Sequence, residues 1–331
     1  MQGNGGTIFV LFSDFPYLRN QQQLNENKIL MYELKQVGPQ SYYINSPAKI
    51  GIYRQSENEV YLIDSGNDKE AAKKALKIAG QNGWRIKGII NTHSNADHIG
   101  GNQYIQKQTG CPIFASGIEG AFTRHPILEP SFLFGGYPFK ELRSKFLMAK
   151  ESEVTDCSSP GFPSELELVP LPGHFFDMVG VRTPDNTVFL ADCVSSPSVL
   201  EKYGVTFIYD VAQYLATLDY IETIDAAVFV PSHADATTDI RPLAALNRAK
   251  VHEIARVIEE ICADPQTTES IIQAIFRAYC LTMTAEQYVL VGSTIRSYLS
   301  WMKDSGKLDV VIGEDSLSWL TLAPSADIPT A

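Results

Sequence analysis

The stretch that most constrains this chain is Thr92-His93-Ser94-Asn95-Ala96-Asp97-His98. It follows an apolar run at residues 86–91, typical of a buried strand, and precedes Gly100-Gly101, which predicts a turn into a helix. A loop between a strand and a helix turns sharply and can direct several side chains at one point. Two imidazoles, a carboxylate and an amide in such a loop form a ligand set suited to zinc and similar metals.

Three further candidate ligands come at or just after predicted strands. His174 follows an alternating run at residues 165–171 and the turn Pro172-Gly173, which would present its ring. Asp192 ends an apolar run that begins at residue 188, and His233 follows residues 227–232. Strand ends that converge at one edge of a sheet are a common place for a site. We therefore expect these three side chains to join the loop at 92–98.

This order of residues resembles the metallo-β-lactamase superfamily, whose signature is Thr-His-x-His-x-Asp-His, then a lone His, a lone Asp and a last His. Matched position by position, the resemblance implies a metal site made from His93, Asn95, Asp97, His98, His174, Asp192 and His233. Leu62 to Gly66 resembles the early strand end whose aspartate, here Asp64, supports the metal loop. The resemblance spans about Met31 to Ala236 and implies an α/β fold, a four-layer αββα sandwich.

Asn95 departs from the pattern, because most of the family has a second histidine at that position. A neutral amide oxygen is a weaker ligand than imidazole for a metal such as zinc. The first metal position would keep His93, His174 and a shared Asp192. The second would keep Asp97, His98, His233 and Asp192. We expect one or two divalent ions, with zinc favoured and manganese or iron left open.

The resemblance implies an enzyme, a metal-dependent hydrolase in which a hydroxide formed at the metal attacks a carbonyl carbon. Asp97 would be the catalytic residue that orients this nucleophile or carries its proton. The small-molecule substrate stays open among thioesters, lactones, esters and β-lactams.

Three alternatives remain beside this hypothesis. The first is a phosphodiesterase or ribonuclease of the same superfamily, which the net charge of −11 disfavours. The second is a non-hydrolytic, iron-dependent redox member, although a di-iron site would have Glu where Asn95 stands. The third is a non-catalytic scaffold, against which the six intact ligand positions argue.

Other chemistry-bearing residues have simpler interpretations. Asp64 is expected to be structural, His252 to lie on the surface of a helix, and His125 to belong to a loop. Cys193 adjoins Asp192 on a predicted strand, so its side chain should point to the opposite face, into the core. The five cysteines are odd in number and scattered, which is typical of reduced thiols in a cytoplasmic protein.

The chain is expected to have three parts: an N-terminal extension (1–30), a catalytic domain (31–238) and a small helical C-terminal domain (239–331). Residues 122–150 form an aromatic-rich insertion, interpreted as a lid, a helical cover or an oligomer contact. Helical patterns at 243–261, 268–279 and 285–302, followed by a predicted hairpin at 307–320, resemble a winged-helix appendage. Between Ile261 and Asp315 there are four basic and seven acidic residues, so nucleic acid is a disfavoured partner.

Composition adds few limits. A chain of 331 residues with 44% hydrophobic content is typical of a globular protein with one large and one small domain. No apolar run approaches the roughly 20 residues that cross a bilayer, so no membrane association is expected. A homo-oligomer is left open.

Overall fold

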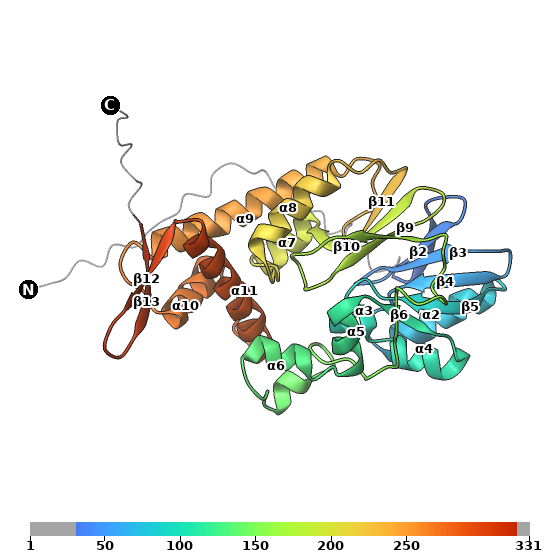
Figure 1. Cartoon of the computed structure of the whole chain (residues 1–331), viewed down its shortest axis with the longest axis horizontal. Helices are drawn as coiled ribbons and strands as arrows, with labels where there is room; N and C mark the ends of the chain where they lie inside the picture. Colours follow the sequence, from blue (N-terminus) through green and yellow to red (C-terminus); the bar gives the residue numbers. More distant parts are fainter. Residues whose placement is uncertain (1–30, 323–331) are drawn as a thin grey trace, which may run out of the picture. The chain divides into compact units, whose positions relative to one another are not determined.

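The computed structural model describes residues 31–322 (Figure 1). The predicted N-terminal extension, residues 1–30, lies outside the described residues.

The first sheet has seven strands in sequence order, β1 to β7. Their bounds are β1 Glu33–Gln36, β2 Ser41–Asn45, β3 Ile50–Arg54, β4 Glu59–Ile63, β5 Arg85–Ile90, β6 Ile113–Ala115 and β7 Thr155–Asp156. Strands β1 to β4 pair antiparallel, whereas β4 to β7 pair parallel. The parallel half brings the carboxyl ends of β4 and β5 to the same edge of the sheet.

The second sheet has four strands in the order β11-β10-β9-β8. Their bounds are β8 Glu167–Pro170, β9 Val179–Arg182, β10 Thr187–Ser195 and β11 Val228–His233. Strands β10 and β11 pair parallel, and their register shifts after Phe189 and again after Ala191. Such irregularities re-aim side chains, and here they fall beside Asp192.

Alternate side chains of the strands in the first sheet pack against two different layers of the fold. In β4, Tyr61 and Ile63 belong to an apolar cluster with Val181 and Phe189 of the second sheet. Val60 and Leu62 belong instead to a cluster with Ala71, Ala72, Ala75 and Ala79 of a helix. Because successive side chains of a strand point to opposite faces, the first sheet packs on the second sheet with one face and on helices with the other.

The outer layers are helical. Helix α2 (Lys69–Gln81), capped at its N-terminus by the Asp68 side chain, and α4 (Asn102–Thr109) cover the first sheet. Helices α8 (Val211–Ile221) and α9 (Arg241–Ile261) pack on the second sheet (Figure 1). The four-layer αββα arrangement predicted from the sequence is therefore confirmed.

The aromatic-rich insertion is largely helical. It contains α6 (Leu128–Phe134) and the 3₁₀ helix η1 (Lys140–Arg143), and α5 (Gly117–Arg124) leads into it. Leu133, Leu142 and Leu147 form an apolar cluster with Val289 of a C-terminal helix. The interpretation as a helical cover therefore fits its packing, although the surface that it meets is a helix rather than the sheet.

The C-terminal region has the expected elements: α10 (Thr268–Ala278), α11 (Ala285–Asp304) and a hairpin of β12 (Leu308–Ile312) and β13 (Leu317–Thr321). The winged-helix resemblance itself stays a prediction. One apolar core contains Leu190 of β10, Leu218 of α8 and Ile295 of α11, so the C-terminal helices share a core with the second sheet. In the described part of the chain, no helix combines the length and the apolar character that crossing a bilayer demands.

Candidate metal centre

The loop after β5 brings together the first group of candidate ligands. It leads into the short helix α3 (Ala96–Ile99), whose N-cap residue is Asn95. His93 and His98 are fully buried beneath the loop, whereas the Asp97 side chain is 44% exposed. The loop therefore presents two buried imidazoles and one accessible carboxylate.

The second sheet and the segment after β8 supply the remaining candidate ligands. His174 follows β8, Asp192 lies within β10, and His233 is the last residue of β11. Ala191 has a φ of 49°, in the left-handed region, at the register shift that precedes Asp192. This distortion interrupts the strand where the carboxylate meets the histidines, as is common beside functional sites.

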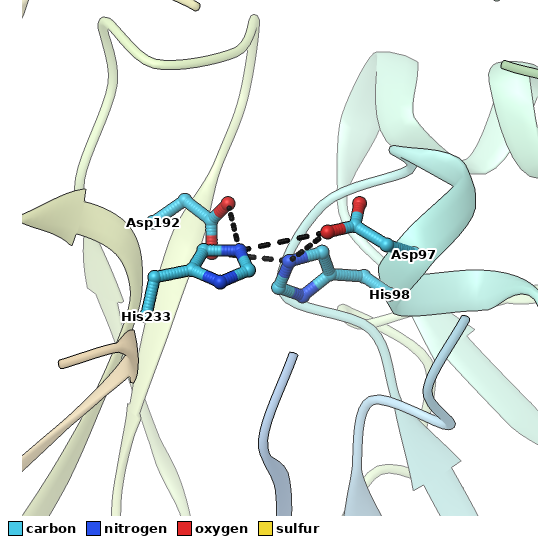
Figure 2. A group of neighbouring side chains, drawn as sticks. All are labelled: Asp97, His98, Asp192 and His233. Carbon is cyan, nitrogen blue, oxygen red and sulfur yellow. Dashed lines mark ion pairs between the residues drawn. The ribbon is translucent and has the colours of Figure 1, made fainter. Parts of the chain in front are cut away.

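Four of these side chains converge, two from α3 and two from β10 and β11 of the second sheet (Figure 2). Nε2 of His98 lies 3.0 Å from Oδ1 of Asp192, and Nε2 of His233 lies 3.0 Å from Oδ2 of Asp192. Oδ2 of Asp97 lies 3.5 Å from Nε2 of His233 and 3.8 Å from Nε2 of His98. One ligand atom from each residue lies within 4.8 Å of the others, so the group could hold one metal ion.

A second group shares Asp192. It consists of His93, His174 and Asp192, whose ligand atoms also lie within 4.8 Å of one another. Nε2 of His174 lies 3.6 Å from Oδ2 of Asp192 and 3.2 Å from Oδ1 of Asn95. The two groups match the two metal positions that the sequence predicts, and Asn95 lies at the edge of the first one.

The buried donor atoms fit a metal. In the described structure, three buried side-chain atoms of the cluster have no hydrogen-bond partner: Nε2 of His93, Nε2 of His98 and Oδ1 of Asp192. The last two lie 3.0 Å apart but not in the geometry of a hydrogen bond. Leaving buried polar atoms unsatisfied costs about 1–3 kcal/mol each. Imidazole nitrogens and carboxylate oxygens in this number are donors that suit zinc. The residues present therefore fit a divalent ion on chemical grounds.

Hydrogen bonds behind the cluster orient the rings. Oδ1 of Asp64 accepts from the backbone N–H of Thr92 at 2.8 Å, and Oδ2 lies 2.8 Å from Nδ1 of His98. Nδ1 of His233 lies 3.0 Å from the carbonyl oxygen of Pro47. When Nδ1 carries the proton, Nε2 of each ring is free to face a metal. Asp64 therefore has the supporting role expected of it.

The charges of the cluster shift its pKa values strongly. Burial would raise the pKa of Asp192, but His233 and His98 hold that pKa well below its usual range. Burial would lower the pKa of His98, but Asp192, Asp97 and Asp64 raise it well above the usual value. Burial, followed by the charge of His98, lowers the pKa of His93, which favours the neutral ring that binds metals.

Sequence reasoning missed two buried carboxylates beside the metal loop. Oε2 of Glu119 accepts from the N–H of Ser94 at 2.9 Å and from its hydroxyl, and burial raises the pKa of Glu119 to about 7. Oε1 of Glu129 accepts from Nδ2 of Asn95 at 2.8 Å, and burial raises the pKa of Glu129 well above its usual value. The local sequence carries no signal for either contact, because both depend on how α5 and α6 pack.

Sequence interpretations away from the cluster are confirmed. His125 and His252 are exposed, and Cys193 is fully buried in the core beside the second sheet. All five cysteines are free thiols.

The cluster opens into a cavity of about 760 Å³. Its lining includes Asn95, Asp97, Glu129, His174, Asp192 and His233. Its other walls include Phe146 and Leu147 of the insertion, Tyr203 and Phe207 after β10, and Leu290 of α11. The C-terminal region and the insertion therefore help to shape the space in front of the candidate metal centre.

Curated relatives match parts of the chain. It is 34% identical over 87 residues to hydroxyacylglutathione hydrolase of Rhodospirillum rubrum, covering 24% of this chain and 33% of that protein. The same enzyme of Shewanella denitrificans is 26% identical over 179 residues, covering 53% of this chain and 57% of that protein. A metallo-beta-lactamase type 2 of Pseudomonas aeruginosa is 25% identical over 156 residues, covering 47% and 56%. The chain thus spans between a third and just over half the length of these relatives.

Solved structures share the fold over most of the chain. A beta-lactamase domain protein from Burkholderia ambifaria superposes with a TM-score of 0.66 at 16% identity, covering 88% of this chain and 94% of that one. A metallo-beta-lactamase family protein from Thermus thermophilus gives a TM-score of 0.64 at 17% identity, covering 88% and 98%. The model of the metallo-beta-lactamase superfamily matches residues 47–233, which contain every candidate ligand. This chain therefore belongs to the metallo-β-lactamase superfamily.

Proposed function

We propose that this protein is a metal-dependent hydrolase of carbonyl substrates, with thioesters as the favoured class. The observation that carries the proposal is the pair of ligand groups that share Asp192 and face one cavity. Curated relatives named hydroxyacylglutathione hydrolase, a thioesterase, support the choice of thioesters among the carbonyl classes.

A divalent ion bound here would supply a water of lowered pKa and an electrophile for the carbonyl oxygen. The side chains supply position and proton transfer. Asp97 is the cluster's accessible carboxylate, and His98 and His233 lower its pKa overall although burial would raise it. An ionised carboxylate at the cavity can accept a hydrogen bond from the attacking water and then hold its proton. We assign that role to Asp97.

The cavity walls favour a substrate with an apolar part. Val199, Val205, Phe207 and Leu290 line it together with Lys202, an exposed cation beside Tyr203. An acyl group could pack on the apolar residues, while an anionic group elsewhere in the substrate would be attracted by Lys202. A volume of about 760 Å³ falls in the range of small-molecule sites.

A substrate panel tests the proposal. Purified protein loaded separately with zinc, manganese or iron would be assayed against thioesters, lactones, esters, β-lactams and phosphodiesters. We expect turnover of a carbonyl substrate, highest for a thioester, and loss of at least about a hundredfold in kcat for D97N. His125→Ala is the matched control, because His125 is exposed and absent from the cluster.

Turnover of phosphodiesters alone would replace the carbonyl assignment with a phosphodiesterase. No turnover of any class by fully metal-loaded protein would instead favour the scaffold or redox alternatives. Both results would leave the metal-binding role of the cluster intact, because that role is measured separately.

A further inference from the structure

Glu129 is an unusual residue for its surroundings. Glu129 lines the cavity although the residue is only 5% exposed, and it comes from α6, outside the segments that carry the candidate metal ligands. Lys145, a cation that lines the same cavity, forms its ion pair with Asp68 instead. A buried carboxylate is costly unless it is paired or lies near a cation. The role of Glu129 is therefore inferred from the hydrogen bond that it accepts from Asn95.

The Asn95 amide has two ends with opposite chemistry. Its Oδ1 can bind a metal, whereas its Nδ2 is a donor with no lone pair to offer. Oε1 of Glu129 accepts a hydrogen bond from Nδ2 at 2.8 Å, so Glu129 contacts the end of the amide that cannot bind a metal. Because the amide is planar, Oδ1 then points away from Glu129, and it lies 3.2 Å from Nε2 of His174. The amide oxygen thus faces the group formed by His93, His174 and Asp192.

We propose that Glu129 is a positioning residue that makes Asn95 a metal ligand. The pair of Asn95 and Glu129 takes the place of the imidazole found in most of the family. The Asn95 amide supplies the oxygen that binds the metal, and the Glu129 carboxylate fixes the orientation of that amide.

Packing holds the carboxylate in place. Leu133, four residues beyond Glu129 on α6, is buried in the cluster with Val289 of α11. The neighbouring Ser94 is held in a similar way by Glu119 of α5. The two helices thus bind consecutive residues of the metal loop. Only Glu129 touches a candidate ligand side chain, which separates its role from that of Glu119.

Glu129→Met tests the inference, because methionine keeps the length of the side chain and removes the acceptor. The readout is binding of Co²⁺ alone, measured by chelator competition and by the visible absorption of the bound ion. We expect affinity at the weaker position to fall at least about tenfold and its absorption to change, with the tighter position unaffected. The melting temperature of the metal-free variant should stay equal or rise, since a buried carboxylate has been removed.

A double-mutant cycle shows whether Glu129 acts through Asn95. In an Asn95→Ala background, Glu129→Met should change Co²⁺ affinity by less than about twofold. Glu129→Gln keeps one acceptor oxygen and should restore part of the affinity. Glu141→Met, at an exposed position of the same insertion, is the matched control and should change nothing.

Unchanged Co²⁺ binding in Glu129→Met would overturn the inference, and so would an equal loss with Asn95 absent. The inference rests on the metal role proposed for Asn95. Its test measures metal binding without turnover, so a failed hydrolase assignment and a failed Glu129 assignment give different results.

Discussion

Oδ2 of Asp64 lies 2.8 Å from Nδ1 of His98, and both side chains are buried. Asp64 also accepts hydrogen bonds from the N–H and the hydroxyl of Thr92, and its own φ is 63°, in the left-handed region. Because a carboxylate oxygen accepts hydrogen bonds, His98 donates from Nδ1, which leaves Nε2 as the ring nitrogen that can face a metal. Asp64, just after β4, thus fixes the orientation of His98, a candidate ligand in the segment after β5.

Asp64→Asn should weaken metal binding without unfolding the protein. The asparagine amide can donate as well as accept, so it no longer favours the His98 tautomer that carries its proton on Nδ1 and turns Nε2 toward the metal position. Loss of such a supporting partner costs about tenfold to a hundredfold in metal affinity. Chelator competition measures the loss, with Asp264→Asn, at an exposed position, as the control. Native affinity in the Asp64 variant would contradict the assigned role.

Asp192 and Asp97 should respond differently to substitution. Asp192 contacts both ligand groups, so Asp192→Ala should lower metal affinity at both positions together with activity. Asp97→Asn keeps the shape of the side chain and removes its charge, so kcat should fall more than metal affinity. Metal binding and turnover measured on the same samples would separate the effects. Parallel losses in both variants would remove the catalytic role of Asp97.

Metal occupancy should be unequal. The position with Asp97, His98, Asp192 and His233 has four charged or imidazole ligands, while the other has three and the Asn95 amide. Protein dialysed against a mild chelator should keep close to one metal per chain by elemental analysis. Asn95→His should tighten the weaker position. Two equally tight metals in the native protein would refute this prediction.

The residues that cluster in the structure could be named from the sequence because their chemistry is local to short motifs. His93, Asp97 and His98 share one segment, and His174, Asp192 and His233 each lie after, within or at the end of a strand, so strand patterns and the resemblance to the superfamily together pointed to them. The four-layer αββα fold was predicted from the resemblance to the metallo-β-lactamase superfamily.

The surroundings of the ligands could not be predicted from sequence. Glu119 and Glu129 reach the metal loop only because α5 and α6 pack where they do, and Leu290 reaches the cavity from a helix near the C-terminus. These contacts join segments far apart in the chain. No periodicity records such contacts, since they depend on the tertiary packing of several helices.

Lys49 gives a pH-dependent prediction. Its Nζ donates to the carbonyl oxygens of Ser232 and Ala234, which flank His233, and burial lowers the pKa of Lys49 from 10.5 to about 8. Between these values the unfolded chain binds more protons than the folded one, so the free energy of unfolding rises with pH. The free energy of unfolding rises by about 3 kcal/mol when the pH increases from about 8 to 10.5.

Lys49→Met removes this titration. The free energy of unfolding of the native protein should therefore rise by about 3 kcal/mol relative to the variant between pH 8 and 10.5. Denaturant titrations of both proteins at a series of pH values give this difference. A difference that stays constant with pH would show that the Lys49 pKa is not lowered in the folded protein.

The most direct test of the central claim is a zinc titration of thioester hydrolysis. Protein stripped with chelator receives zinc in steps, and bound zinc and thioester cleavage are measured in the same samples. We predict no cleavage by the stripped protein, recovery in proportion to bound zinc, and little recovery in the Asp97→Asn variant at equal occupancy. Cleavage that does not depend on zinc, or zinc-saturated protein that cleaves no carbonyl substrate, would contradict the account.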